Sequence, residues 1–251
     1  MTKDRKTRDI QVCCESLHDA VQARDGGARR IELCAALELG GLTPSCGLID
    51  AVRRECPELE INVLIRPRPG NFVYSEKDIE QMLFDIKQCR KMGVHGVVVG
   101  ALTRDGDINT RVCRRLMNLA KYECSYPALS VTFHRAFDVC RDPQQALEEI
   151  IGLRCDCLLT SGQRATALEG AGNIAEYIRQ ARGRINVMPG CGITPDNIAD
   201  IEAITGATIF HASARGVAST NQVYTNPHVD FGENRPVRHT SATLVQQLIN
   251  I

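Results

Sequence analysis

The chain has 251 residues, 43% of them hydrophobic, and its 30 basic and 30 acidic residues give no net charge. This balance disfavours nucleic acid or an anionic membrane as a partner. The first nine residues are polar and no apolar run is long enough to span a bilayer, so we expect neither a signal peptide nor a transmembrane helix. Twelve cysteines without a Cys-x-x-Cys pair indicate free thiols in a reducing compartment.

Eight short apolar runs alternate with helical segments along the chain. They cover residues 10–14, 30–34, 63–66, 97–102, 130–135, 157–162, 185–192 and 209–213. Nearly all end in a polar, charged or glycine residue, which is typical of a (β/α)8 TIM barrel, where the chemistry lies at the strand ends. We therefore predict a single TIM-barrel domain over residues 1–251. An open doubly wound sheet is disfavoured, because Cys13-Cys14-Glu15-Ser16 replaces the usual glycine-rich turn after the first strand.

Local signals place several helix starts. Ser75 and Asp78 form a capping-box pattern, and Gly93 ends the apolar repeat that follows. Asp142-Pro143 places proline in the first helical turn, and Thr194-Pro195 predicts the same kind of start after the seventh strand.

Two connections are longer than the minimal repeat. Residues 66–74 follow the third strand, and residues 215–240 follow the eighth. Long loops are commonly lids, interface elements or disordered segments. Both leave from strand ends on the expected functional side, and we predict a long loop at 215–240 that is a lid, an oligomer contact or disordered.

Residue parity sorts strand side chains into inward and outward sets. On the second strand, apolar Ile31 and Leu33 are expected to face the helices, which directs Glu32 and Cys34 toward the barrel axis. The same alternation predicts further inward positions: Gln11, Cys13, Arg66, Thr132, His134, His211 and Ser213. We expect an ion pair between Glu32 and Arg66, because an unpaired buried charge is costly. Such a set indicates a functional site, although a self-satisfied structural network is the alternative.

A glycine-rich segment at residues 188–193 follows the seventh strand. Barrels often bind phosphate there through backbone N–H groups and a helix N-terminus. Gly190 and Gly192 are therefore candidate anion-binding residues, with Ser161 and Arg135 beside them; a simple tight turn is the alternative.

Several unusual segments together resemble the CutC copper homeostasis family, and the similarity runs from about Ile10 to Arg215. They are residues 31–34, 40–45, 65–68, 132–138, 159–162 and 210–215. The resemblance implies a β/α barrel, a cytoplasmic location (also nuclear in animals), a homo-oligomer, a link to copper tolerance and Cu(I) binding.

The resemblance places the family's proposed Cu(I) ligands on Cys13 and Cys34. Both are inward by parity on adjacent strands, and soft Cu(I) selects thiolates. The family usually carries Glu two residues before the first of these cysteines, where this chain has Gln11. That departure removes a carboxylate and leaves both thiols in place.

Two functional hypotheses follow. The first is a copper-binding protein that holds Cu(I) between Cys13 and Cys34 for storage, buffering or delivery. The second is an enzyme acting on a small anionic or phosphorylated substrate, and a barrel with a vestigial pocket is a weaker third. The enzyme hypothesis assigns acid or base roles to Glu32, His134 and Asp138, a polarising role to His211, and anion binding to Arg66, Arg135, Ser161, Gly190 and Gly192.

Overall fold

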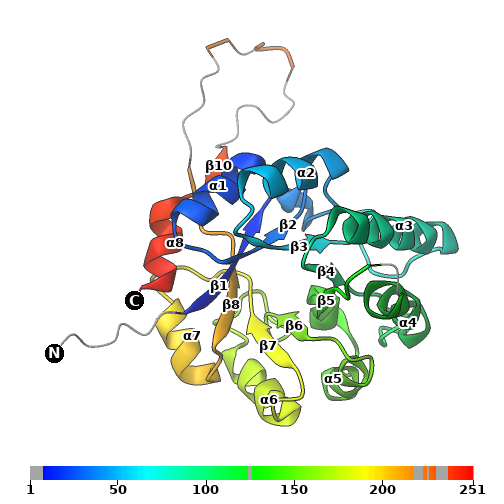
Figure 1. The fold of residues 1–251 in the computed structure, drawn as a ribbon. Helices are drawn as coiled ribbons and strands as arrows, with labels where there is room; N and C mark the ends of the chain where they lie inside the picture. Colours follow the sequence, from blue (N-terminus) through cyan, green and yellow to red (C-terminus); the bar gives the residue numbers. More distant parts are fainter. Residues whose placement is uncertain (1–7, 124–125, 218–222, 225, 230–236, 251) are drawn as a thin grey trace.

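The computed structural model describes residues 8–123, 126–217, 223–224, 226–229 and 237–250. Eight parallel strands form one sheet in the order β7-β6-β5-β4-β3-β2-β1-β8. A parallel bridge between Gly190 and His211 connects the edge strands, so the sheet curls into a nearly closed barrel (Figure 1). The strands are β1 (Asp9–Cys14), β2 (Arg30–Leu33), β3 (Glu60–Leu64), β4 (Gly96–Val99), β5 (Ser130–Phe133), β6 (Cys157–Thr160), β7 (Asn186–Pro189) and β8 (Ile209–Ala212).

Helices surround this barrel in the described part of the chain (Figure 1). They are α1 (Leu17–Asp25), α2 (Cys46–Glu55), α3 (Glu76–Met92), α4 (Thr110–Met117), α5 (Pro143–Gly152), α6 (Ala171–Ala181), α7 (Ile198–Thr205) and α8 (Ala242–Ile249). Three short elements are the 3-10 turns η1 (Leu37–Leu39) and η3 (Arg135–Val139) and the π-helical turn η2 (Asn118–Tyr122). The predicted TIM-barrel fold is confirmed. Across the described residues, no helix combines the length and apolar character that crossing a bilayer requires.

Helix caps follow the local sequence in two places. Ser75 caps α3 in a complete capping box with Asp78, and Gly93 ends the helix in the left-handed region at φ +65°. Asp142 accepts a hydrogen bond from the Gln145 N–H and Pro143 occupies the first turn of α5. These predictions are confirmed because each depends on neighbours within one helical turn.

The predicted helix start at Thr194-Pro195 is wrong. The α7 helix begins at Ile198, and residues 194–197 form a turn that precedes it. Asn197 stabilises this turn, because its Oδ1 accepts the Thr194 N–H at 2.9 Å and its Nδ2 donates to the Gly192 carbonyl at 2.8 Å. The glycine segment therefore runs into a side-chain-braced turn and does not open a helix directly.

The barrel wall separates two apolar environments. Ile31 and Leu33 belong to the large core that includes helix residues such as Met82. Cys13 and Cys34 belong instead to a small separate cluster. The parity prediction for β2 is therefore confirmed, and the barrel interior also contains the buried polar residues Gln11, Glu32, Asn62 and Thr132.

A two-stranded antiparallel ribbon lies beyond the barrel. It pairs β9 (Arg215–Val217) with β10 (Arg238–Thr240). The Thr240 N–H donates to Asp19 Oδ1 at 2.8 Å, which attaches the ribbon to α1. The long loop predicted at 215–240 thus begins and ends in ordered strands, and much of its middle lies outside the described residues.

Candidate functional site

The β1 and β2 ends bring two thiols together. Cys13 is paired in register with Glu32, and Cys34 directly follows β2. Their Sγ atoms lie 3.7 Å apart, and both cysteines are free and buried. Leu64 and Val98 pack against them. The contact with Cys34 and burial raise the pKa of the Cys13 thiol well above its ordinary value, so the metal-free Cys13 thiol holds its proton at neutral pH.

Glu32 and His211 complete the floor of the site. Glu32 Oε2 lies 3.9 Å from His211 Nδ1, and both side chains are at least 88% buried. Burial raises the pKa of Glu32 to about 7. Burial, reinforced by the charge of Arg135, lowers the pKa of His211 to about 4. The imidazole is therefore neutral at pH 7, and the carboxyl exchanges its proton close to that pH.

Gln11 links these two groups. Its Nε2 donates to Glu32 Oε2 at 3.4 Å and lies 3.3 Å from His211 Nδ1. Asn62 Nδ2 donates to Gln11 Oε1 at 3.0 Å, which fixes the amide with its NH2 group toward the site. The sequence predicts that Gln11 points inward and lacks the family's carboxylate, but it does not predict these contacts. The amide instead provides hydrogen-bond donors to a buried acid, which a second carboxylate could not do while ionised.

Among the described residues, three side chains could bind a metal ion as a group. Cys13, Glu32 and His211 each offer one ligand atom, and these atoms all lie within 4.8 Å of one another. Cys34 lies beside Cys13 but is outside this group. The site therefore contains a two-thiol pair and a mixed sulfur, oxygen and nitrogen set that share Cys13.

The predicted ion pair between Glu32 and Arg66 is wrong: within the described residues, no Arg66 nitrogen lies within ion-pair distance of that carboxylate. The guanidinium binds backbone carbonyls instead, with Nη1 donating to Leu39 and Gly41 at 3.0 and 2.8 Å and Nη2 donating to Gly70 at 2.9 Å. Arg66 thereby fixes the two loops that follow β2 and β3. The guanidinium binds these loop carbonyls rather than the Glu32 carboxylate because buried carbonyls need hydrogen-bond donors.

His134 is held as a hydrogen-bond donor. Its Nδ1 accepts the Ala136 N–H at 3.1 Å. Burial, with the charge of Arg66, lowers its pKa to about 3, so the ring is neutral and its hydrogen resides on Nε2. That buried Nε2 has no hydrogen-bond partner among the described residues, and the same is true of Arg66 Nε. In this state the His134 Nε2–H can donate a hydrogen bond, and the ring is a weak base, which disfavours the base half of the predicted acid or base role.

Phe72 connects these two side chains. Its ring centroid lies 5.1 Å from Arg66 Cζ and 5.0 Å from the His134 ring. The sequence places Phe72 in the long connection after the third strand but does not predict these contacts, since no periodic signal tells which side of a loop faces the barrel.

Asp138 organises the loop after β6. Its carboxylate accepts from the Ser161 N–H and hydroxyl, the Thr160 hydroxyl and the Gln163 N–H, and it binds Arg135 Nε at 2.7 Å. Arg135 Nη2 also donates to Ser161 Oγ at 2.9 Å. A central cavity of about 690 Å³ lies at the carboxyl ends of the strands; Asp138 and Ser161 do not line it, whereas Arg135 does. The geometry thus gives Asp138 and Ser161 a positioning role toward Arg135.

The two glycines after β7 differ. The Gly190 N–H donates to the Thr160 carbonyl at 2.9 Å as part of the barrel wall, so it is not available to an anion, and that prediction is wrong. Gly192 has φ +71° and lines the cavity. It remains a candidate contact for a ligand.

Most of the predicted site residues line this cavity of about 690 Å³ at the carboxyl ends of the strands. Its wall includes Cys13, Glu32, Arg66, His134 and His211, so the predicted convergence of strand ends is confirmed for these residues. Arg238 also lines it from β10. No local signal identifies Arg238, because the ribbon alone brings it back to the barrel.

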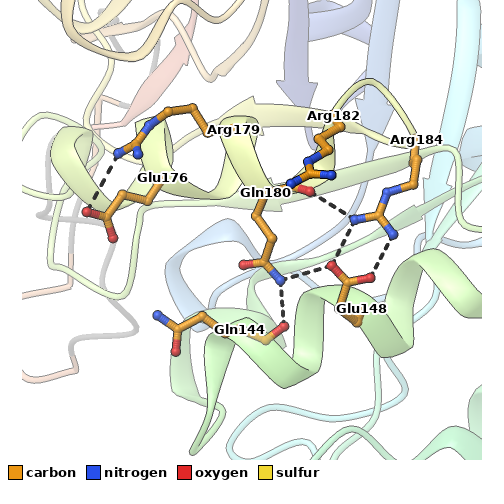
Figure 2. A pocket seen from close by; sticks show the side chains of 7 residues that line it. All are labelled: Gln144, Glu148, Glu176, Arg179, Gln180, Arg182 and Arg184. Carbon is orange, nitrogen blue, oxygen red and sulfur yellow. Dashed lines mark hydrogen bonds and ion pairs between the residues drawn. The ribbon is translucent and has the colours of Figure 1, made fainter.

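A second concavity, of about 760 Å³, lies between α5 and α6 (Figure 2). Four of its five charged side chains are paired with one another: both Arg184 Nη atoms bind Glu148 at 2.7 and 2.8 Å, and Arg179 pairs with Glu176. These side chains are exposed, and the groove has none of the convergent buried polar groups of the central cavity. The candidate site is therefore the cavity at the barrel end.

Comparisons with known proteins identify the family. A model of the CutC family matches residues 8–216. A CutC family protein of Parabacteroides distasonis is 49% identical over 227 residues, covering 90% of this chain and 91% of the relative. One from Xanthomonas axonopodis is 44% identical over 242 residues, covering 96% and 97%.

Solved structures agree with the fold. A crystal structure of a Streptococcus agalactiae protein named for copper homeostasis, CutC, is 29% identical with a TM-score of 0.76, covering 82% of this chain and 98% of that one. Phosphoribosyl anthranilate isomerase from Thermotoga maritima is only 12% identical with a TM-score of 0.56, covers 96% of both chains, and shows a similar barrel alone. The family model and the close relatives together show that this chain belongs to the CutC family.

Proposed function

We propose that this protein binds Cu(I) between Cys13 and Cys34 and serves copper homeostasis. The observation that carries the proposal is the 3.7 Å separation of the two Sγ atoms inside the barrel. With metal–sulfur bonds of about 2.3 Å, as in zinc thiolates, sulfurs at that separation subtend about 107° at a shared ion. Two thiolates are the ligands that soft Cu(I) prefers.

The surroundings of the pair favour a soft ion of low charge. Cys34 is fully buried, and Leu64 and Val98 supply apolar contacts. Hard cations prefer a shell of several carboxylate, carbonyl and water oxygens, whereas the oxygen contact of the Cys34 Sγ is the single Cys14 carbonyl at 3.4 Å among the described residues. Copper must displace thiol protons, and the raised pKa of Cys13 makes that release costly at low pH. We therefore expect the apparent Cu(I) affinity to increase with pH.

Storage, buffering and delivery of copper all require this reversible binding. A relative's name links the family to copper homeostasis. The homo-oligomer and the cytoplasmic or nuclear location remain predictions from the family resemblance.

The proposal is tested by anaerobic Cu(I) titration against a competing chelator. The Cys13→Ser/Cys34→Ser double variant should lose high-affinity binding. A matched control is Cys155→Ser/Cys157→Ser, which removes two buried thiols near the start of β6, away from the site, and should retain it. Equal affinity in the parent protein and the first double variant would exclude copper binding at this pair.

An enzymatic function on a small anionic substrate is the second candidate. The cavity volume of about 690 Å³ supports it, because it falls in the range of small-molecule sites and far exceeds the needs of one ion. Glu32 is the acid or base candidate that the geometry favours, since its pKa of about 7 suits proton transfer at neutral pH. Arg66, Arg135 and Gly192 would contact the anion. An ordered phosphate beside Arg135 in a soaked crystal would support this candidate.

A further inference from the structure

Cys13 belongs to two ligand sets at once. Cys34 approaches it from one side, while Glu32 and His211 approach it from the other. The second set draws on β1, β2 and β8, three neighbouring strands of the barrel. Within the described residues it is the one group of three such side chains close enough to share an ion.

We propose that Cys13, Glu32 and His211 form a second site, which shares Cys13 with the Cu(I) pair and takes a divalent cation of the zinc class. Zinc takes cysteine sulfur, histidine nitrogen and carboxylate oxygen together. The three ligand atoms lie within 4.8 Å of one another. Tetrahedral coordination with bonds of about 2.0–2.3 Å requires them to close by about 1 Å, a movement within reach of side-chain rotation.

Charge balance favours a doubly positive ion at this position. A Cys13 thiolate and a Glu32 carboxylate carry two negative charges, and His211 is neutral. Among the described residues Glu32 has no arginine or lysine within ion-pair distance; its contacts are the Gln11 amide and the His211 ring. A buried carboxylate without a cation is costly, and a divalent ion neutralises the set.

The surrounding amide network prepares these ligands. Gln11 touches both Glu32 and His211, and Asn62 holds Gln11 in that orientation. Such outer contacts orient metal ligands and commonly affect metal affinity 10- to 100-fold, by order of magnitude.

The site also leaves one coordination position open. Cys13, Glu32 and His211 all line the 690 Å³ cavity, whereas Cys34 does not. Three protein ligands with a fourth position free for water or substrate is the arrangement of catalytic rather than structural zinc. A bound ion would therefore face the space in which a small molecule fits.

The test uses variants that should each lose the binding of one metal and retain the binding of the other. Zn²⁺ affinity is measured by chelator competition, and Co²⁺ serves as the spectroscopic probe, because a thiolate ligand gives a sulfur-to-cobalt charge-transfer band. Glu32→Gln and His211→Gln should each weaken Zn²⁺ binding at least about 100-fold, since a direct ligand matters more than an outer one. Both variants should retain Cu(I) binding. Cys34→Ser should show the reverse pattern, and Cys13→Ser should lose both metals.

Several outcomes would overturn the proposal. The first is a parent protein that binds no Zn²⁺, and the second is unchanged Zn²⁺ affinity in both Glu32→Gln and His211→Gln. Loss of Zn²⁺ together with Cu(I) in Cys34→Ser would show that one two-thiol site takes both ions. Thermal melts establish that each variant folds, and near-isosteric Glu32→Gln gives the decisive reading if His211→Gln is unstable. A failure of copper binding alone leaves the zinc result readable, so the two proposals are tested independently.

Discussion

Replacement of Glu32 by glutamine should change how stability depends on pH. The folded state raises the pKa of this carboxyl from 4.5 to about 7 because the side chain is buried. As pH rises above 4.5, the unfolded chain releases this proton while the folded protein still holds it, so each increase in pH favours unfolding. The penalty grows between pH 4.5 and about 7 and is then constant. Glutamine carries no titrating proton and escapes it.

The size of the effect follows from the shift. One pKa unit corresponds to about 1.4 kcal/mol, so a shift of this size costs the metal-free protein about 2.5 kcal/mol between roughly pH 5 and pH 8. Urea unfolding of the metal-free parent and Glu32→Gln at both pH values gives a double difference from which other titrating groups cancel. The variant should gain that amount relative to the parent as pH rises.

The control is Glu80→Gln on the exposed face of α3, which should show no such gain. An equal stability difference between Glu32→Gln and the parent at both pH values would refute the idea that burial raises this pKa. The statement that the buried Glu32 carboxyl exchanges its proton close to pH 7 would then be wrong as well.

Three further changes test other parts of the structure. Gln11→Glu places a second carboxylate within hydrogen-bond distance of Glu32, so its melting temperature relative to the parent should fall as pH rises from about 6 to 8; a pH-independent difference would argue against this contact. Asp138→Asn removes a buried charge that binds five donor groups and should cost about 3 kcal/mol in urea unfolding, whereas a cost below about 1 kcal/mol would contradict the network. Gly162→Ala should destabilise by at least about 2 kcal/mol, because the backbone has φ +69° and the new Cβ would lie 2.4 Å from a carbonyl oxygen. Its matched control, Gly172→Ala within α6, meets nothing within 4 Å and should be neutral or stabilising by up to about 1 kcal/mol; similar melting temperatures for both glycine variants would count against the strain argument.

Local and periodic information in the sequence determined the barrel. Strand parity placed Cys13, Glu32 and Cys34 on the inner face, because alternation along a strand depends only on the backbone. The α3 and α5 caps were equally predictable, since a cap contacts residues within one turn. The helix start after β7 was not, because Asn197 braces a turn there through a side-chain contact that outweighs the proline signal.

Tertiary structure alone decided the partners of the inward polar groups. Parity brings Arg66 and Glu32 to the same face, but the carbonyls of two loops bind the guanidinium first. Asp138, predicted as an acid or base group, binds Arg135 in an ion pair that the sequence pattern does not reveal. Gln11 joins Glu32 to His211 across a separation of about 200 residues. Such contacts depend on the closure of the barrel and on loop paths, and neither leaves a periodic trace in the sequence.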